Sequence, residues 1–344
     1  MGAPVDGQGR RRQSRAGPAS SLSGLLLLAL ALAGAPAEAD TSLGTLTLHT
    51  DNDFYVSRRD RHYTSGLQLS WTSAADQTPD WMRRLALLPG HEPDARVHWA
   101  LGLGQNIYTP AGVALRTRRY RDRPYAGWLY GSWGLARVSG AGLDAAMLHL
   151  GMVGKASLAE PTQEWLHGAM GMKPPRGWEK QLQNELGGAL VLSRQRRLRR
   201  PPSEDRTGFE LTAHGTVCLG NVFTYGGGGV GARWGKGLAG DFGHARISPG
   251  LPGASTFERR DSWAWAAHLG AEGRLVARNL FLDGNTFAES ARVPRRVFVA
   301  DAEAGVSLTY RNARLTYALV VRSEEFDDQQ GPDLFGTLSL AFIP

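Results

Sequence analysis

Apolar and polar residues alternate one by one over long stretches of this chain, and this alternation most constrains how it can fold. Between Thr64 and Ser73, every second residue from Leu67 to Trp71 is apolar, and the residues between them are polar. A period of two places successive side chains on opposite faces of a β-strand. The same pattern recurs in residues 314–322. The chain is therefore predicted to be rich in strands with one apolar face.

About twelve such segments follow one another along the sequence. They cover roughly residues 44–51, 63–73, 96–108, 124–138, 142–154, 185–198, 205–216, 219–234, 262–281, 296–310, 313–323 and 333–342. Two stretches interrupt the rhythm. A short helix is expected near residues 160–172 and ends before Pro174 and Pro175. Residues 235–261 are rich in Gly and Pro and are expected to form a loop.

The N-terminus has the three parts of a secretory signal peptide. Four arginines precede an unbroken run of Leu and Ala at residues 25–32, and residues 37–39 match an A-x-A cleavage site. The run is too short to span a bilayer as an ordinary helix. Residues 1–39 are therefore expected to be removed, leaving residues 40–344 as one domain. An uncleaved membrane anchor is the alternative.

An exported chain with this pattern has one route into a membrane. After the signal, no apolar run reaches the roughly 18 residues that a spanning helix needs. Only helices and closed barrels satisfy every backbone polar group in lipid. The prediction is an all-β fold, a single transmembrane antiparallel β-barrel of about twelve strands with one short helix. A soluble β-sandwich, whose apolar strand faces would form the core, is the alternative.

Tryptophans are expected to mark the two edges of the membrane. Aromatic girdles form at the interfaces between hydrocarbon and water, near the ends of the strands. The tryptophans within or near predicted strand ends are Trp71, Trp99, Trp128, Trp133, Trp263 and Trp265.

The composition limits the kinds of functional site and partner that the chain can have. The single cysteine, Cys218, excludes an intramolecular disulfide and a site with several cysteine ligands. The formal net charge of +7 suits anionic lipids or phosphorylated sugars. Nucleic acid is not expected as a partner, because the arginines are dispersed and the protein is exported. The sequence contains no Gly-x-Ser-x-Gly elbow, His-Glu-x-x-His motif or P-loop, so a serine nucleophile is unsupported.

Two polar clusters are expected at one end of the barrel. Asp51-Asn52-Asp53 ends the first strand, and its carboxylate and amide oxygens suit a hard cation such as calcium. A polar strand end with turn chemistry is the competing reading. The segment around Thr64 opens the second strand about a dozen residues later, so a hairpin would bring the two clusters together.

Two further groups could act on a substrate. Gln163 and His167 are spaced i, i+4 on the expected helix and share one face. A histidine can take a proton from water near neutral pH, although a packed or surface histidine is the simpler alternative. Arg116 lies in an arginine-rich segment before Pro124, where guanidinium groups could bind phosphate or form a solvated loop.

Six motifs in order resemble the outer-membrane lipid A 3′-O-deacylase family (LpxR-like). They are Asp51-Asn52-Asp53-Phe54, Asp60-Arg61-His62-Tyr63-Thr64-Ser65-Gly66, Gln105-Asn106-Ile107-Tyr108-Thr109-Pro110, Asp122-Arg123-Pro124-Tyr125-Ala126-Gly127-Trp128, Gln163-x-x-x-His167 and Gly177-Trp178-x-x-Gln181-x-x-Asn184-Glu185. The resemblance implies a twelve-stranded barrel in the outer membrane of a Gram-negative envelope. It also implies a calcium-dependent esterase that releases the 3′-linked acyloxyacyl group of lipid A.

The resemblance also assigns roles to residues. His167 would be the general base. Asn52, Asp53, Thr64 and Gln163 would line the site, with Asp53 toward the metal and calcium polarising the ester carbonyl.

Arg116 matches a basic family position that could hold a phosphate of the lipopolysaccharide substrate. The chain departs from the family pattern at Leu115, where some members carry lysine, and at Lys173, where an active-site glutamate can occur. The functional alternatives are a non-catalytic barrel, porin-like or structural, and a hydrolase for another lipid ester.

Overall fold

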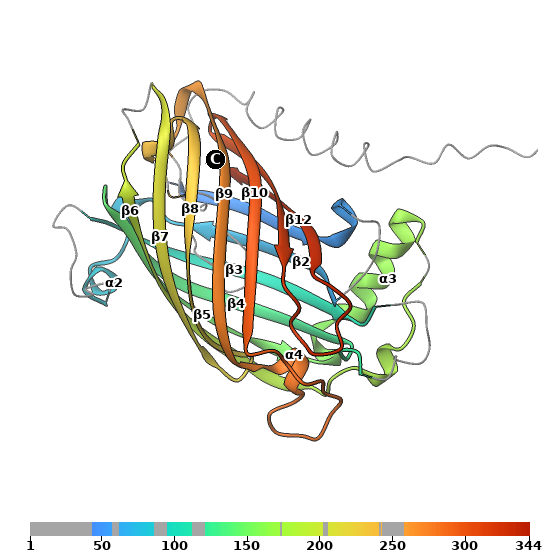
Figure 1. The fold of residues 1–344 in the computed structure, drawn as a ribbon. Helices are drawn as coiled ribbons and strands as arrows, with labels where there is room; N and C mark the ends of the chain where they lie inside the picture. The colour runs from blue at the N-terminus through green and yellow to red at the C-terminus, as the bar shows by residue number, and fades with distance from the viewer. Residues whose placement is uncertain are drawn as a thin grey trace, which may run out of the picture.

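The chain forms a barrel of long strands (Figure 1). The computed structural model describes residues 43–56, 62–85, 95–111, 121–172, 174–201, 206–240, 242 and 258–344. Within these ranges the strands are β1 (Thr45–Asn52), β2 (His62–Thr72), β3 (Arg96–Thr109), β4 (Ala126–Val138), β5 (Gly142–Val153), β6 (Glu185–Arg199), β7 (Thr207–Gly220), β8 (Phe223–Lys236), β9 (Arg260–Asn279), β10 (Phe298–Arg311), β11 (Ala313–Arg322) and β12 (Asp333–Phe342). The predicted signal peptide and most of the predicted loop at 235–261 lie outside the described residues.

Each strand pairs antiparallel with its neighbours in sequence, and β1 pairs with β12 to close the sheet. At the closure Leu46 lies opposite Phe342 and Asn52 lies opposite Gly336. Closure leaves no unpaired strand edge, which is the condition for a sheet to sit in lipid. The prediction of a twelve-stranded antiparallel barrel is confirmed for the described part of the chain.

The two ends of the barrel differ. The terminal end, where β1 begins and β12 ends, has connections as short as Asn312 alone between β10 and β11. The loop end carries the long connection of residues 154–184, which includes helix α3 (Ala159–Met170), and the short helix α4 (Leu280–Asp283). Helix α2 (Asp80–Leu85) follows β2 at the terminal end. The predicted helix at 160–172 is confirmed as α3, which lies beside the barrel at its loop end (Figure 1).

None of the helices in the described ranges is long and apolar enough to cross a membrane.

The apolar faces of the strands point outward. Leu67 of β2 and Leu103 of β3 have 48% and 58% of their surface exposed, whereas polar residues of β1 such as Thr47 and His49 are buried in the lumen. A soluble sandwich would bury the leucines instead. The burial pattern therefore supports the barrel over the sandwich alternative, since lipid is the environment that suits an exposed apolar belt.

The lumen at the loop end is filled by aromatic side chains. Tyr108 stacks on Phe281 with ring centroids 4.1 Å apart, and Trp128 packs against Tyr130 at 4.3 Å. Trp128 is only 2% exposed. Its predicted place in an interfacial girdle is therefore wrong: it lies on the inward face of β4, in a core that alternation alone does not reveal.

Other aromatic residues do form a girdle, at the terminal end. Trp71 and Trp99 meet edge to face with centroids 4.8 Å apart, as do Trp234 and Trp265. Trp263 adds a further exposed ring to this end and stacks on Tyr310 at 4.4 Å. Amphipathic rings of this kind favour the level of the lipid head groups.

A buried ion-pair network secures the lumen at the terminal end. Glu210, fully buried, accepts hydrogen bonds of 2.5 Å from Arg197 Nε and Arg233 Nε. Arg233 also donates to the carbonyl of Leu238, and the Arg197 guanidinium lies 3.9 Å above the ring of Phe242. The two arginines thereby hold Leu238 and Phe242 inside the barrel.

Replacing Glu210 with Gln should destabilise the barrel strongly. The change leaves two buried guanidinium groups without their carboxylate, which costs about 3–5 kcal/mol in comparable sites. The matched control is Glu258→Gln, which removes the exposed pair between Arg96 and Glu258 and should cost at most about 1 kcal/mol. The temperature at which the purified barrel loses its folded mobility on a gel measures both. Equal shifts in the two variants would show that the network does not hold the lumen.

Candidate active site on the outer barrel wall

The side chains of the cluster Asp51-Asn52-Asp53 lie on different sides of the barrel wall. Asp51 points into the lumen, where it accepts a hydrogen bond of 3.1 Å from Tyr63 Oη and lies 3.0 Å from His49 Nε2. Asn52, the next residue, has the opposite orientation and pairs with Ser65 of β2 and Gly336 of β12. The alternation of a strand therefore assigns Asp51 to the lumen and Asn52 to the outer wall.

The segment after Asn52 folds back over the outer wall. Asp53 is buried and begins the 3₁₀ helix η2 (Asp53–Tyr55), which packs against β12 and β2. Tyr55 lies over Gly336, and its hydroxyl is 3.4 Å from Thr50 Oγ1. Burial raises the pKa of Tyr55 above its usual value. The turn thus covers this corner of the barrel and encloses Asp53 beside Asn52.

Thr64 occupies an irregularity of β2. The pairing of β2 with β3 shifts between Tyr63 and Ser65, as in a β-bulge. Tyr63 consequently points into the lumen, while Ser65 pairs with the outward Asn52. The predicted proximity of the second cluster to the first is confirmed at the level of the backbone.

Helix α3 turns a polar face toward the barrel. Ala159, Gln163 and His167 are spaced four residues apart and are its deeply buried residues, with exposures of 1%, 1% and 3%. The residues between them are half-buried or exposed, and Glu164 and Trp165 are among the exposed ones. The i, i+4 spacing of Gln163 and His167 therefore has the predicted consequence: both side chains share the face that the helix buries.

Close packing sets the position of α3 on the wall. A side chain at Gly127 of β4 would place Cβ 2.2 Å from Ala159 Cβ and equally close to Ser157 Oγ, so only glycine fits. Gln105 of β3 donates from Nε2 to the carbonyl of Ser157 at 2.7 Å. Ile107 of β3 completes the apolar contact with Ala159. These positions are outward-facing, so α3 lies on the outside of the barrel.

Trp178 orients Gln163. The indole Nε1 of Trp178 donates to Gln163 Oε1 at 2.9 Å, and its ring packs 5.0 Å from that of Tyr125. Tyr125 Oη in turn donates to the Arg176 carbonyl at 2.6 Å. Gly177 has a φ of +113°, which favours glycine, and a Cβ there would meet the Tyr125 ring. The motifs that contain Tyr125, Gln163 and Trp178 thus meet around the Gln163 side chain.

The structure brings the candidate residues to one end and one face of the wall. Asn52 and Thr64 lie on β1 and β2, and α3, with Gln163 and His167, packs on β3 and β4. These four strands are consecutive neighbours in the barrel. Arg116, together with the departures at Leu115 and Lys173, lies outside the described residues.

The donor set for a metal is sparse. Within the described ranges, no three or more His, Cys, Asp and Glu side chains gather into a metal-binding group. Calcium takes about six to eight oxygen ligands, but amide oxygens, backbone carbonyls and water supply many of them in proteins. Asp53, enclosed beside the Asn52 amide, fits a weak site in which most ligands are uncharged.

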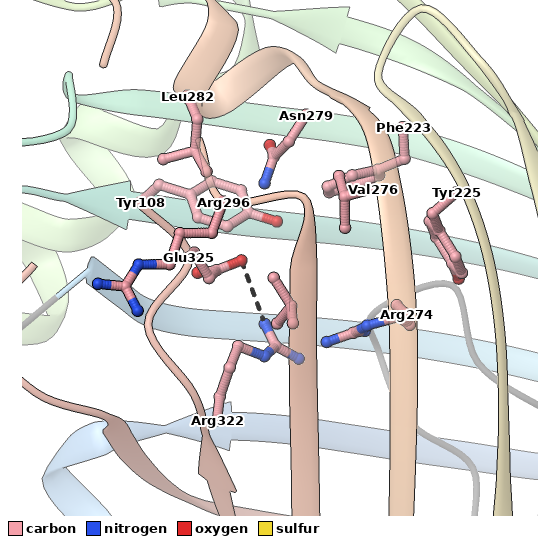
Figure 2. Close-up of a pocket in the computed structure, with 11 residues that line it drawn as sticks. Tyr108, Phe223, Tyr225, Arg274, Val276, Asn279, Leu282, Arg296, Arg322 and Glu325 are labelled. Atoms are coloured by element: carbon pink, nitrogen blue, oxygen red, sulfur yellow. Dashed lines mark ion pairs between the residues drawn. The ribbon is translucent and has the colours of Figure 1, made fainter. Parts of the chain in front are cut away.

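The luminal side of the same end holds a separate pocket of about 30 Å³ (Figure 2). Arg322 binds Asp301 with two hydrogen bonds of 3.0 Å and lies 3.9 Å from Glu325, while Arg274 also reaches Asp301. Burial raises the pKa of Glu325, but Arg322 and Arg123 outweigh burial and keep it below its usual value. This volume suits one or two water molecules rather than an organic substrate.

The luminal network was missed by sequence reasoning. Arg123 and Glu325, whose side chains meet at 3.3 Å, are 202 positions apart in the sequence. The available signal was the pattern of charged residues at inward positions of the last strands, such as Asp301 and Arg322. The pattern shows which charged side chains meet only when the register of β10 and β11 is known.

The closed barrel, its outward apolar belt and the polar wall site at the loop end define an integral β-barrel protein of an outer membrane. A family model described as "Outer membrane protein LpxR" matches residues 25–343. The chain therefore belongs to the LpxR family of outer membrane proteins.

The solved structure of one LpxR protein shows the same fold. The chain is similar to LpxR from Salmonella typhimurium, with 18% identity, a TM-score of 0.69, and coverage of 87% of this chain and 100% of the other. The autotransporter β domain of Bordetella BrkA follows with 12% identity, a TM-score of 0.43 and coverage of 88% and 99%. The NalP translocator domain of Neisseria meningitidis has 11% identity, a TM-score of 0.41 and coverage of 95% and 98%. A search of curated proteins gave no match.

Replacing Gly127 with Val should detach α3 without unfolding the barrel. The new side chain would overlap Ala159 and push the helix away from the wall. The control is Gly131→Val on the same outward face of β4, where the nearest atoms to a Cβ are 4.0 Å away. We expect roughly tenfold faster proteolysis within residues 154–184 for the first variant and no change for the second. Similar cleavage rates for both variants would contradict the packing of α3 described above.

Proposed function

We propose that this protein is an outer-membrane hydrolase that releases the 3′-linked acyloxyacyl group of lipid A. The carrying observation is that α3 buries Gln163 and His167 against the outer wall, near the end of β1 that bears Asn52. Membership of the LpxR family and the motif resemblance to lipid A deacylases support the choice of substrate. Lipid A belongs to the leaflet that the loop end of such a barrel meets.

The surface below the site suits acyl chains. Leu67 and Leu69 of β2, and Leu101 and Leu103 of β3, point outward and are about half exposed. Leu67 is directly opposite Gln105, at the edge of the polar site. A lipid lying along this wall would keep its chains on the leucines and present its ester at the level of the polar residues.

His167 is proposed as the general base that activates water. Imidazole is suited to accept a proton near neutral pH, and its position on the buried face of α3 shields it from bulk solvent. Gln163, held by Trp178, would fix the approach of water or substrate through its amide nitrogen. Asn52 and Thr64 would line the opposite side, on neighbouring strands. Arg116 is proposed to bind a lipid A phosphate.

Calcium is proposed as the cofactor, with Asp53 as its carboxylate ligand and Asn52 contributing an amide oxygen. When bound, such an ion polarises an ester carbonyl and stabilises charge that develops on its oxygen. One carboxylate predicts weak binding, toward the millimolar range of extracellular calcium sites.

Changing His167 to Ala should abolish acyl release while the barrel still folds. Loss of a general base lowers the rate by about 10²–10⁴-fold. Mass spectrometry of lipid A from Gram-negative cells that express the chain would show loss of the 3′ acyl group for the unaltered protein only. Glu164→Ala, an exposed change on the same helix, should keep full activity.

Three results would redirect the proposal. Full activity of the His167 variant would exclude it as the base. If lipid A is unchanged although the protein is verified in the outer membrane, and phospholipid is cleaved instead, the substrate is another lipid ester. Ion conductance across a planar bilayer without any lipid turnover would favour a porin-like barrel.

Calcium dependence has its own test. Titration calorimetry should detect weak Ca²⁺ binding by the purified protein, and Asp53→Asn should reduce that binding at least about tenfold because the proposed carboxylate ligand is lost. Acyl release should fall on chelation and return with Ca²⁺ in the unaltered protein. Equal Ca²⁺ binding by the two proteins would remove Asp53 from the metal site.

A further inference from the structure

Three arginines surround one aspartate on the outside of the barrel. Arg137 donates to Asp144 Oδ2 at 2.6 Å, and Arg194 and Arg196 approach the same carboxylate at 2.8 and 3.0 Å. The residues come from β4, β5 and β6, and Arg137 and Arg194 each lie directly opposite Asp144 in the sheet. We name these four residues the arginine cluster.

The arginine cluster faces lipid rather than the lumen. On β4 the luminal residues include Ser132 and Ala136, which alternate with the outward Trp133, Leu135 and Arg137. On β6, Arg194 and Arg196 continue the outward row of Leu190 and Leu192, both well exposed. A charged group directly follows the apolar belt at this point of the wall.

The depth of the cluster corresponds to the head groups of the periplasmic leaflet. Arg137 is four residues beyond Trp133 toward the terminal end, about 13 Å along the strand. Trp99, part of the girdle at the terminal end, lies opposite Leu135. Leu135 is the outward residue of β4 immediately before Arg137, so the cluster lies at about the level of this girdle. β1 begins and β12 ends at this end, and the one-residue connection at Asn312 is here too, as is usual for the periplasmic side.

The cluster offers more donors than its own carboxylate can use. Three guanidinium groups present about fifteen N–H donors, whereas a carboxylate accepts at about four sites. The side chains of Arg194 and Arg196 remain 48% and 35% exposed, although both contact Asp144. Asp144 therefore holds the arginines together on the outer wall, and parts of Arg194 and Arg196 stay accessible from outside the barrel.

Small residues beside the arginines leave room for a head group. Arg194 pairs with Gly215 of β7 and Arg196 with Ala213. A Cβ on Gly215 would meet no atom nearer than 3.9 Å, so the wall beside the arginines is not crowded at this glycine. Val217, next along the same outward face, is 45% exposed and continues the surface toward the membrane centre.

We propose that the arginine cluster binds the phosphate of an anionic glycerophospholipid of the periplasmic leaflet. The guanidinium groups of Arg194 and Arg196 would form paired hydrogen bonds with the phosphate oxygens. The acyl chains would lie on Leu190, Leu192 and Val217. The site is on the opposite leaflet from the proposed active site, and it does not depend on the proposed enzymatic function.

Native mass spectrometry of the purified full-length protein in neutral detergent tests this site, with phosphatidylglycerol as the probe and zwitterionic phosphatidylcholine as the reference lipid. The double variant Arg194→Gln with Arg196→Gln should bind phosphatidylglycerol about tenfold more weakly than the unaltered protein. The matched control is Arg199→Gln with Arg311→Gln. It removes the same charge from the terminal end, where those arginines lie over aromatic rings.

The expected result is selective retention of phosphatidylglycerol by the unaltered protein and the control, but not by the cluster variant. Equal retention by both double variants would overturn the proposal, as would equal binding of the two lipids by the unaltered protein. Displacement of the lipid by millimolar inorganic phosphate would show that the cluster binds a free anion only. If the glutamine variant does not fold, Arg194→Lys with Arg196→Lys keeps the charge and should still bind more weakly, because lysine lacks the paired donors.

Discussion

The hydrogen-bonded ladder between β1 and β12 is the interaction on which the rest of the structure depends. Without it, two strand edges would be exposed to lipid, where each unmatched backbone group costs several kcal/mol. Closure also fixes the identity of the two faces, because every side chain must point either to the lumen or to the membrane. The division of Asp51 and Asn52 between these environments follows directly from it.

The lumen and the wall then serve different purposes. Inside, aromatic packing around Trp128 and ion pairs around Glu210 fill the barrel and stabilise it. Outside, the wall is apolar at mid-height and polar at the loop end, where α3 attaches through Gly127. The polar groups around Glu210 are thus kept within the barrel, and the polar residues proposed to act on lipid lie on the outer wall.

The sequence predicted the strands closely, because alternation persists wherever one face meets lipid. It predicted that Gln163 and His167 share a helix face, since that depends only on helical spacing. It did not show that Trp128 faces inward, because an aromatic lumen and an aromatic girdle look alike in a pattern of period two. Nor did it show the contact of Arg123 with Glu325, which depends on the curvature of the whole sheet. Local sequence patterns therefore predict the helices and strands, whereas contacts across the barrel can be seen only in the closed structure.

The outward position of α3 sets how any ligand of the wall site must arrive. A luminal site is filled from water, at a rate that depends on bulk concentration. The wall site would instead be approached sideways by its proposed lipid substrate, diffusing within the leaflet. Its occupancy would follow the number of lipids per unit of membrane area, and crowding or ordering of that leaflet would slow the encounter even when the protein itself is unchanged.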